Sequence, residues 1–296
     1  MAIDYNRLMA RQLAERTHRY SWRDTVLYAL GLGLGTNPTD SDELQFVYEK
    51  GLRALPTMAV VLGHPGFWVS EPDTGIDFRK VVHGEQSLTI HTPMPAEGAM
   101  IARNSVDEII DKGEGRGALL RVRRDLIDEA TGVLQSTQIM SMFCRGDGGF
   151  GGPSIGKPQP DGAIPDRAPE LSITRVIPPQ AALIYRLSAD LNPLHADPAV
   201  AEAAGFPRPI LHGLATFGIA GYAVLAAVAN SAPEALRELS SRFSAPVFPG
   251  ESLRVDIWTN ANEAVFRCTA VEREKVVLDR GRAVFANRGT NQGNTA

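Results

Sequence analysis

Groups able to transfer protons stand close together in the second half of the chain, at Asp190, Asn192 and His195. An imidazole has an unperturbed pKa near ~6.5, so it exchanges protons at neutral pH, and a carboxylate can share that work. Pro193 lies between them, and proline disfavours helix both at its own position and at the preceding residue. We therefore expect a turn that points Asp190 and His195 into one pocket. A purely structural turn and cap is the alternative, because Asp and Asn favour both.

A long, almost uncharged segment follows this turn at residues 211–228 and predicts a buried helix. Its glycines and the embedded His212 favour a helix packed inside protein over a membrane span. Gly213 stands at its beginning, where free N–H groups and the positive end of the helix dipole suit a polarised carbonyl oxygen. Between turn and helix, Asp197 and Pro198 predict the cap and first turn of a short helix at 199–204. The segment thus offers both proton-transfer groups and an oxyanion donor.

The stretch from Asp190 to His195, together with residues 205–213, resembles the hydratase 2 motif of the MaoC-like, (R)-specific enoyl-CoA hydratases. Matching segments occur in the same order along nearly the whole chain, at residues 24–31, 46–49, 55–57, 83–86, 111–113, 148–152 and 242–250. The resemblance is to the two-repeat form, in which a degenerate N-terminal hot-dog unit accompanies a catalytic C-terminal unit. One departure is Ala189, where the family usually has glycine.

The resemblance implies reversible hydration of trans-2-enoyl-CoA to (3R)-3-hydroxyacyl-CoA in fatty acid metabolism. Asp190 and His195 would transfer the protons in an order that the sequence leaves open, and Asn192 would orient the water or the carboxylate. The N–H of Gly213 would bind the oxyanion. The family pattern also places four residues near the acyl-CoA, His83, Gly84, Lys112 and Arg242, and suggests three residues behind the site, Tyr28, Glu49 and His212.

The resemblance requires no cofactor, because acyl-CoA is the substrate. The histidines, at positions 18, 64, 83, 91, 195 and 212, show no H-E-x-x-H or comparable ligand spacing, so we expect no metal site.

The chain is expected to be α+β, a double hot-dog of two antiparallel sheets, each wrapped around a central helix. Residues 145–170 hold seven glycines and five prolines and predict a linker between an N-terminal unit, 1–144, and a catalytic unit, 171–290. The glycines at 146–152 indicate a loop and not a phosphate cradle, because no lysine and serine or threonine follow them. The expected helical segments are 23–30 and 55–62, and the expected strands are 81–82, 87–91, 99–105, 118–124, 138–144, 253–259, 264–271 and 282–286.

Composition narrows the class of protein. A chain of 296 residues with 44% hydrophobic and 22% charged residues is typical of globular proteins, and a net charge of −4 argues against general nucleic-acid binding. Two isolated cysteines and the absence of an apolar leader or peroxisomal ending predict a cytoplasmic protein without a membrane span. A monomer and a homodimer both fit.

Three alternatives to a hydratase of enoyl-CoA have related sequence features. A dehydratase acting on acyl carrier protein thioesters would use the same catalytic groups, and a non-catalytic acyl-CoA-binding protein would keep the motif only as a fold element. A hot-dog thioesterase is disfavoured, since the Asp-x-Asn-Pro-x-His turn resembles the hydratase pattern.

Overall fold

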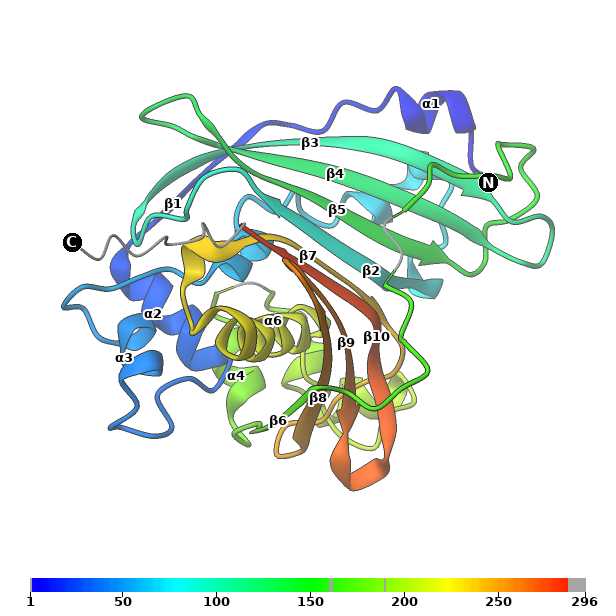
Figure 1. The fold of residues 1–296 in the computed structure, drawn as a ribbon. Coiled ribbons are helices and arrows are strands. Elements are labelled where there is room, and N and C mark those ends of the chain that lie inside the picture. Colours follow the sequence, from blue (N-terminus) through cyan, green and yellow to red (C-terminus); the bar gives the residue numbers. More distant parts are fainter. Residues whose placement is uncertain (1, 160–161, 189, 287–296) are drawn as a thin grey trace.

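The computed structural model describes residues 2–159, 162–188 and 190–286. Ala189, the departure from the family pattern, lies outside the described residues, as do the last residues of the expected catalytic unit. The fold is α+β as expected, with one large antiparallel sheet that curves around α6 on one side (Figure 1). The strands are β1 (Arg16–Tyr20), β2 (Val81–Ile90), β3 (Gly98–Asp111), β4 (Ala118–Asp128), β5 (Leu134–Cys144), β6 (Leu171–Val176), β7 (Leu236–Phe243), β8 (Ser252–Asn260), β9 (Glu263–Ala270) and β10 (Lys275–Phe285).

The strand order reveals an internal repeat that the residues themselves barely show. The ten strands lie in the order β1-β3-β4-β5-β2-β7-β10-β9-β8-β6. From one edge to the centre the order is β1-β3-β4-β5-β2, and from the other edge it is β6-β8-β9-β10-β7. Each half therefore has its strands in the same relative order. Strands β2 and β7 pair antiparallel at the centre, from Glu85 opposite Arg242 to Thr89 opposite Glu238. Two five-stranded units are thus joined edge to edge, which removes one exposed sheet edge from each.

Along the chain, most helices fall between the first and second strands of each unit, that is, between β1 and β2 and between β6 and β7. The helix α6, long and apolar, packs into the concave side of the second unit (Figure 1). Glycines let its neighbours come close: a Cβ on Gly221 would lie 2.7 Å from Leu239 Cδ2, and one on Gly218 would lie 2.9 Å from the Tyr28 hydroxyl. The α-helices are α1 (Tyr5–Met9), α2 (Trp22–Gly31), α3 (Ser41–Val47), α4 (Ala181–Tyr185), α5 (Pro198–Ala203) and α6 (Gly213–Ala229). The 3-10 helices are η1 (Pro56–Val61), η2 (Trp68–Ser70), η3 (Pro72–Thr74), η4 (Phe78–Lys80), η5 (Pro193–His195), η6 (Pro233–Ala235) and η7 (Val271–Arg273).

The first unit differs from the second in its central element. Where α6 fills the second unit, the first unit has only η1, a buried 3-10 helix of six residues. The segment ends because Gly63 adopts a positive φ of 64° and a proline follows two residues later. Its last carbonyls are satisfied from the sheet, since Arg124 Nη1 donates to the oxygens of Val60 (3.1 Å) and Leu62 (2.9 Å). The expected central helix of this unit is therefore replaced by a much shorter one.

The glycine-rich loop after β5 is held by a carboxylate of the chain itself. Asp111 accepts hydrogen bonds from the N–H groups of Gly149 (2.7 Å), Gly151 (2.8 Å) and Gly113 (2.8 Å). These donors, Gly149 first, lower the pKa of Asp111 below its ordinary value. The N–H groups that could have bound a phosphate are thus already occupied. No helix or strand lies between Cys144 and Leu171 in the described part of this segment.

In the ranges that the structure describes, no helix is both long and apolar enough to cross a membrane.

Candidate active site

The turn after α4 is shaped by its own polar side chains. Asp190 Oδ1 accepts the backbone N–H of Asn192 at 2.9 Å, and Asn192 Oδ1 accepts the N–H of Leu194 at 3.0 Å. Pro193 then occupies the first position of η5, which ends at His195. The cap uses the Asn192 oxygen, so its amide nitrogen stays available as a donor. Asp190 and Asn192 are exposed, whereas only 8% of His195 is exposed.

A second histidine packs directly on the first. The rings of His195 and His212 are stacked, with centroids 3.6 Å apart and planes 26° from parallel. His195 Nδ1 lies 2.8 Å from the Ile210 carbonyl, and His212 Nε2 lies 3.0 Å from the Asp190 carbonyl. A carbonyl only accepts, so these two nitrogens carry the protons, and the lone pairs are on His195 Nε2 and His212 Nδ1. His212 thereby ties the beginning of α6 to the Asp190 turn.

Burial keeps both imidazoles neutral near pH 7. Desolvation lowers the pKa of His195, an effect that the Ile210 carbonyl and the Asp190 carboxylate oppose. Desolvation, followed by the electrostatic effect of the neighbouring His195 imidazole, lowers the pKa of His212 to about 4. A neutral His195 with its Nδ1–H held by a backbone carbonyl presents a basic Nε2 to solvent or substrate. This is the state that a general base needs.

Gly213 begins α6 directly beside this pair. The N–H groups of Ala215 and Thr216 both donate to the His212 carbonyl, at 3.1 Å each. Within the described residues nothing accepts from the Gly213 N–H, as expected for the first residue of a helix. A free N–H at the positive end of a 17-residue helix suits a developing oxyanion.

His83 on β2 is the residue of the first unit that lies near Gly213. Its ring contacts Phe243 on β7, with centroids 4.6 Å apart, and a Cβ on Gly213 would lie 3.3 Å from Phe243 Cε1. Gly84 follows at a β-bulge in the β2–β5 pairing, between His83 and Glu85. The predicted residues His83 and Gly84 thus lie one ring away from Gly213.

The sequence interpretation missed His64, which follows η1. Desolvation lowers the pKa of His64 to about 4. The nearby Asp190 carboxylate has a smaller effect in the opposite direction. His64 Nδ1 accepts the Gly66 N–H at 3.1 Å. Only its place beside Gly63 in the loop that ends η1 could have drawn attention to it.

The other candidates are not brought to the histidine pair by any contact among the described residues. Arg242 is exposed, opposite Glu85 and Asp279 in the sheet, and Lys112 lies in the turn after β3. Exposed Glu49 lines an open depression with Trp22, away from the histidine pair. Tyr28 is different, because it is fully buried and its ring packs on Tyr185 (5.7 Å), whose ring contacts His212 (5.0 Å). Tyr28 thus lies one ring away from His212, with Tyr185 between them.

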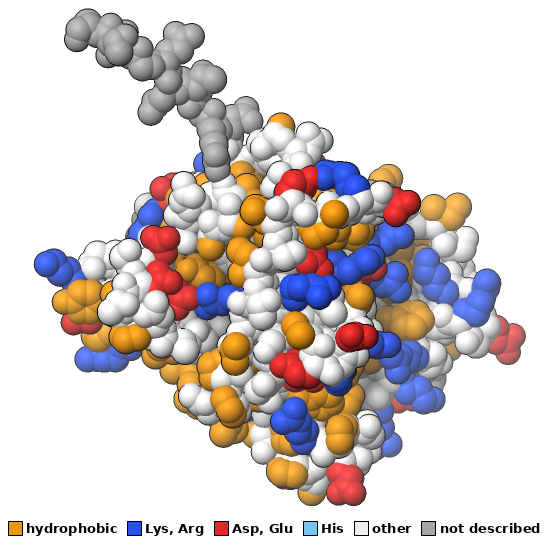
Figure 2. Space-filling view, turned by 60° about the horizontal axis from the view of Figure 1, so that its bottom comes forward, with side chains coloured by type: hydrophobic (Ala, Val, Ile, Leu, Met, Phe, Trp, Pro, Cys, Tyr) orange, Lys and Arg blue, Asp and Glu red, His pale blue; other side chains and the backbone are white. Residues whose placement is uncertain are grey.

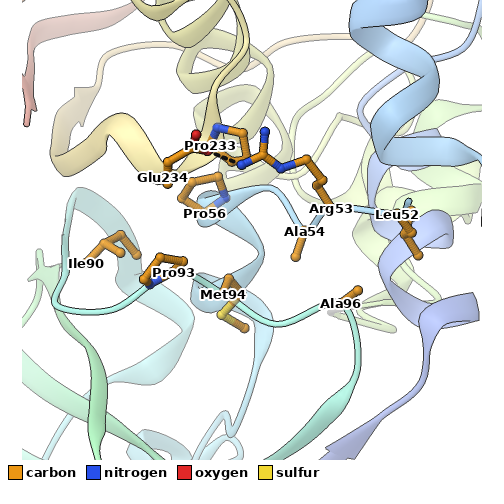
Figure 3. Close-up of a pocket in the computed structure, with 10 residues that line it drawn as sticks. All are labelled: Leu52, Arg53, Ala54, Pro56, Ile90, Pro93, Met94, Ala96, Pro233 and Glu234. Atoms are coloured by element: carbon orange, nitrogen blue, oxygen red, sulfur yellow. Dashed lines mark hydrogen bonds and ion pairs between the residues drawn. The ribbon is translucent and has the colours of Figure 1, made fainter. Parts of the chain in front are cut away.

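A cavity of about 200 Å³ lies at the other end of α6 from Gly213 (Figure 3). Both units contribute to it: Pro56, Ile90 and Met94 belong to the first, and Pro233 to the second. The Arg53–Glu234 ion pair joins the two units across it. The cavity contains none of the residues predicted to be catalytic.

The fold also groups side chains that linear spacing kept apart. Asp190, His195 and His212 each place one possible metal-ligand atom within 4.8 Å of the others. The expectation of no metal site rested on spacing alone and stays a prediction.

Comparisons with known proteins identify the same family as the sequence motifs. Residues 160–280 match the model of the MaoC like domain, and residues 18–146 match that of the MFE-2 hydratase 2 N-terminal domain. A 3-hydroxyacyl-thioester dehydratase Y of Mycobacterium tuberculosis is 38% identical over 95% of this chain and 98% of its own length. A peroxisomal enoyl-CoA hydratase 2 of Arabidopsis thaliana is 37% identical over 92% of each chain. The crystal structure of a MaoC-like dehydratase from Phytophthora capsici superposes with a TM-score of 0.86 at 29% identity, covering 98% of this chain and 100% of that one.

Proposed function

The chain belongs to the MaoC-like, hydratase 2 family of double hot-dog enzymes, and we propose that its Asp190–His195 turn and the beginning of α6 catalyse reversible hydration of trans-2-enoyl-CoA to (3R)-3-hydroxyacyl-CoA. It is a hydro-lyase of fatty acid metabolism. One observation carries the assignment of the site: Asp190, the neutral His195 and His212 lie together, and Gly213, whose N–H begins α6 without a partner among the described residues, directly follows His212.

Hydration forms a C–O bond at C3 and a C–H bond at C2 of the enoyl group. A water proton passes to the Asp190–His195 pair as its oxygen attacks C3, and the pair delivers a proton to C2, so no net proton is gained or lost. The two groups act on one shared water. The charge that builds on the thioester oxygen is stabilised by the Gly213 N–H and the α6 dipole. Asn192 Nδ2 orients the water or the carboxylate. No step in this sequence needs a metal or a cofactor.

We assign acyl-chain binding to the first unit. Its concave side holds only the short η1 in place of a long helix, and the apolar side chains of η1 lie where a tail could run. CoA is strongly anionic, and Figure 2 shows one face of the molecule on which Lys and Arg side chains gather toward the right-hand side, despite the overall charge of −4. Lys112 and Arg242 are the proposed phosphate contacts. Activity confined to short enoyl chains would count against this assignment.

The test is a direct assay with crotonyl-CoA and longer trans-2-enoyl-CoAs, following the loss of enoyl absorbance and the configuration of the product. We expect the R product, and Asp190→Asn and His195→Ala should each lower kcat by about 10²–10⁴-fold. Asp197→Asn is the matched control. Asp197 caps α5 by accepting the Ala199 N–H at 2.9 Å, and Asn caps as well as Asp does. An S product, or near-normal rates for both site variants, would overturn the proposal.

Two alternatives share the same fold. A dehydratase of acyl carrier protein thioesters would turn over carrier-bound substrate faster than the CoA ester. A non-catalytic acyl-CoA-binding protein would bind acyl-CoA saturably without turnover. The free lone pair of His195 beside Asp190 favours an enzyme over a binding protein, since binding alone requires no base.

Cytoplasmic location and a possible homodimer remain part of the proposal. A monomer already contains both hot-dog units, so pairing between chains is not needed to complete the site. Sedimentation of the purified protein decides between monomer and dimer.

A further inference from the structure

The Asp190, His195 and His212 group has the features of a transition-metal site. Each histidine donates one ring N–H to a backbone carbonyl, His195 to Ile210 and His212 to Asp190. Metal-binding histidines typically have this second hydrogen bond, because it fixes the tautomer and aims the other nitrogen's lone pair. That other nitrogen in His212, Nδ1, is buried and has no partner among the described residues, while the residue is 3% exposed.

We propose that a divalent transition metal of the Zn²⁺ type binds Asp190, His195 and His212 and inhibits the enzyme by occupying its acid/base site. Two imidazole nitrogens and one carboxylate oxygen form a ligand set that zinc accepts, with water in the fourth position. Mg²⁺ and Ca²⁺ prefer oxygen ligands and are not expected to bind. The site is inhibitory and not a resident cofactor site.

Metal binding requires the three ligand atoms to move closer together. One ligand atom from each residue lies within 4.8 Å of the others, whereas a tetrahedral ion with bonds of about 2.0–2.1 Å needs them about 3.3 Å apart. Asp190 is exposed, so its side chain can turn inward, and the 26° tilt between the rings must widen for both lone pairs to reach one ion. Neither backbone hydrogen bond involves the nitrogens that would bind the metal.

The consequence for catalysis rests on the proposed function. The metal would take the lone pair of His195 and the carboxylate of Asp190, the two groups that act on water. Inhibition should therefore be reversed by a chelator and opposed by bound acyl-CoA.

The first test uses no activity and so is independent of the proposed function. The full-length, chelator-treated protein is titrated with Co²⁺ and followed by visible absorption, and Zn²⁺ binding is measured by calorimetry. We expect one ion per chain, the intense visible bands of a tetrahedral nitrogen and oxygen site, and no near-ultraviolet thiolate band. A thiolate band would place the metal on Cys144 or Cys268 and would overturn the proposal.

Variants then identify the ligands. His212→Gln keeps a donor for the Asp190 carbonyl and removes the free ring nitrogen, while Asp190→Asn changes an exposed residue that cannot disturb the core. Each should weaken Zn²⁺ and Co²⁺ binding by about 10-fold or more, since even loss of an outer-shell partner has that size of effect. His91→Gln is the matched control, because His91 is exposed and its ring bonds Thr137 Oγ1 at 3.0 Å, away from the histidine pair. Unchanged affinity in both site variants, or equal weakening in the control, would refute the site.

The activity arm completes the test. Zn²⁺ should inhibit hydration at one ion per chain, Mg²⁺ should not, and inhibition should persist unchanged in His91→Gln. Metal binding without inhibition would overturn the inhibitory role, and an inactive protein that still binds Co²⁺ would refute the proposed function while leaving the metal site standing.

Discussion

Replacing Gly213 by proline isolates the proposed oxyanion donor. Proline removes the N–H, yet it is favoured at the first position of a helix, where no intrahelical bond is lost. His212 has φ −58° and ψ 136°, which is the extended conformation that a residue before proline adopts. The new Cβ meets Phe243 Cε1 at 3.3 Å, so the ring must give by a few tenths of an ångström. The helix should therefore still begin at residue 213.

We expect kcat for Gly213→Pro to fall by about 10²–10³-fold, or about 3–4 kcal/mol of transition-state stabilisation, the size of effect seen when one oxyanion donor is removed. Gly213→Ala is the control, since it introduces the same contact with Phe243 and keeps the N–H. Steady-state rates with crotonyl-CoA measure both variants, and calorimetric binding of a saturated acyl-CoA checks that the proline ring has not blocked the site. If Gly213→Pro and Gly213→Ala have the same kcat, the N–H does not stabilise the transition state.

Three further predictions concern stability. Gly221→Ala should lower the free energy of unfolding by about 1–3 kcal/mol in a denaturant titration, because its Cβ would lie 2.7 Å from Leu239 Cδ2 inside a packed interface; an unchanged midpoint would contradict the close packing of α6. Arg124→Met should lower the free energy of unfolding by about 1–3 kcal/mol for each carbonyl, of Val60 and of Leu62, that loses its donor. Arg124→Lys, which keeps a donor, should lower it by less. Desolvation lowers the pKa of His83 to about 4, so His83 is neutral when folded and protonated when unfolded below pH 6.5. The free energy of unfolding should therefore be unaffected by His83 above pH 6.5 and should fall by at most about 1.4 kcal/mol per pH unit as the pH drops from 6.5 toward 4. In urea titrations, His83→Gln should make this fall less steep. An equally steep fall in the variant would refute the prediction.

Sequence alone identified the features that depend on local chemistry. The Asp190–His195 turn and the beginning of α6 follow from proline, capping side chains and an apolar segment, and the structure has them at those positions. Six of the ten strands follow from the same kind of signal, whereas the family and the double hot-dog fold followed from the resemblance of the motifs to the hydratase 2 pattern. The edge strands β1 and β6, the central strand β7 and the first half of β10 were not among the expected strands. The sequences of β1 and β7 are mostly polar and carry no clear alternation.

Tertiary structure decided what two distant segments do together. The stacking of His212 on His195 joins residues seventeen positions apart, and the pairing of β2 with β7 brings His83 of the first unit to Phe243 and Gly213 of the second. The replacement of a central helix by η1 depends on side chains of the sheet that satisfy its carbonyls. Turns and helix ends are determined within a few residues, so the motif could be interpreted from the sequence. Burial, tautomer and the free nitrogen of His212 arise only when both units pack, and these properties determine whether the motif can bind a proton, a substrate or a metal.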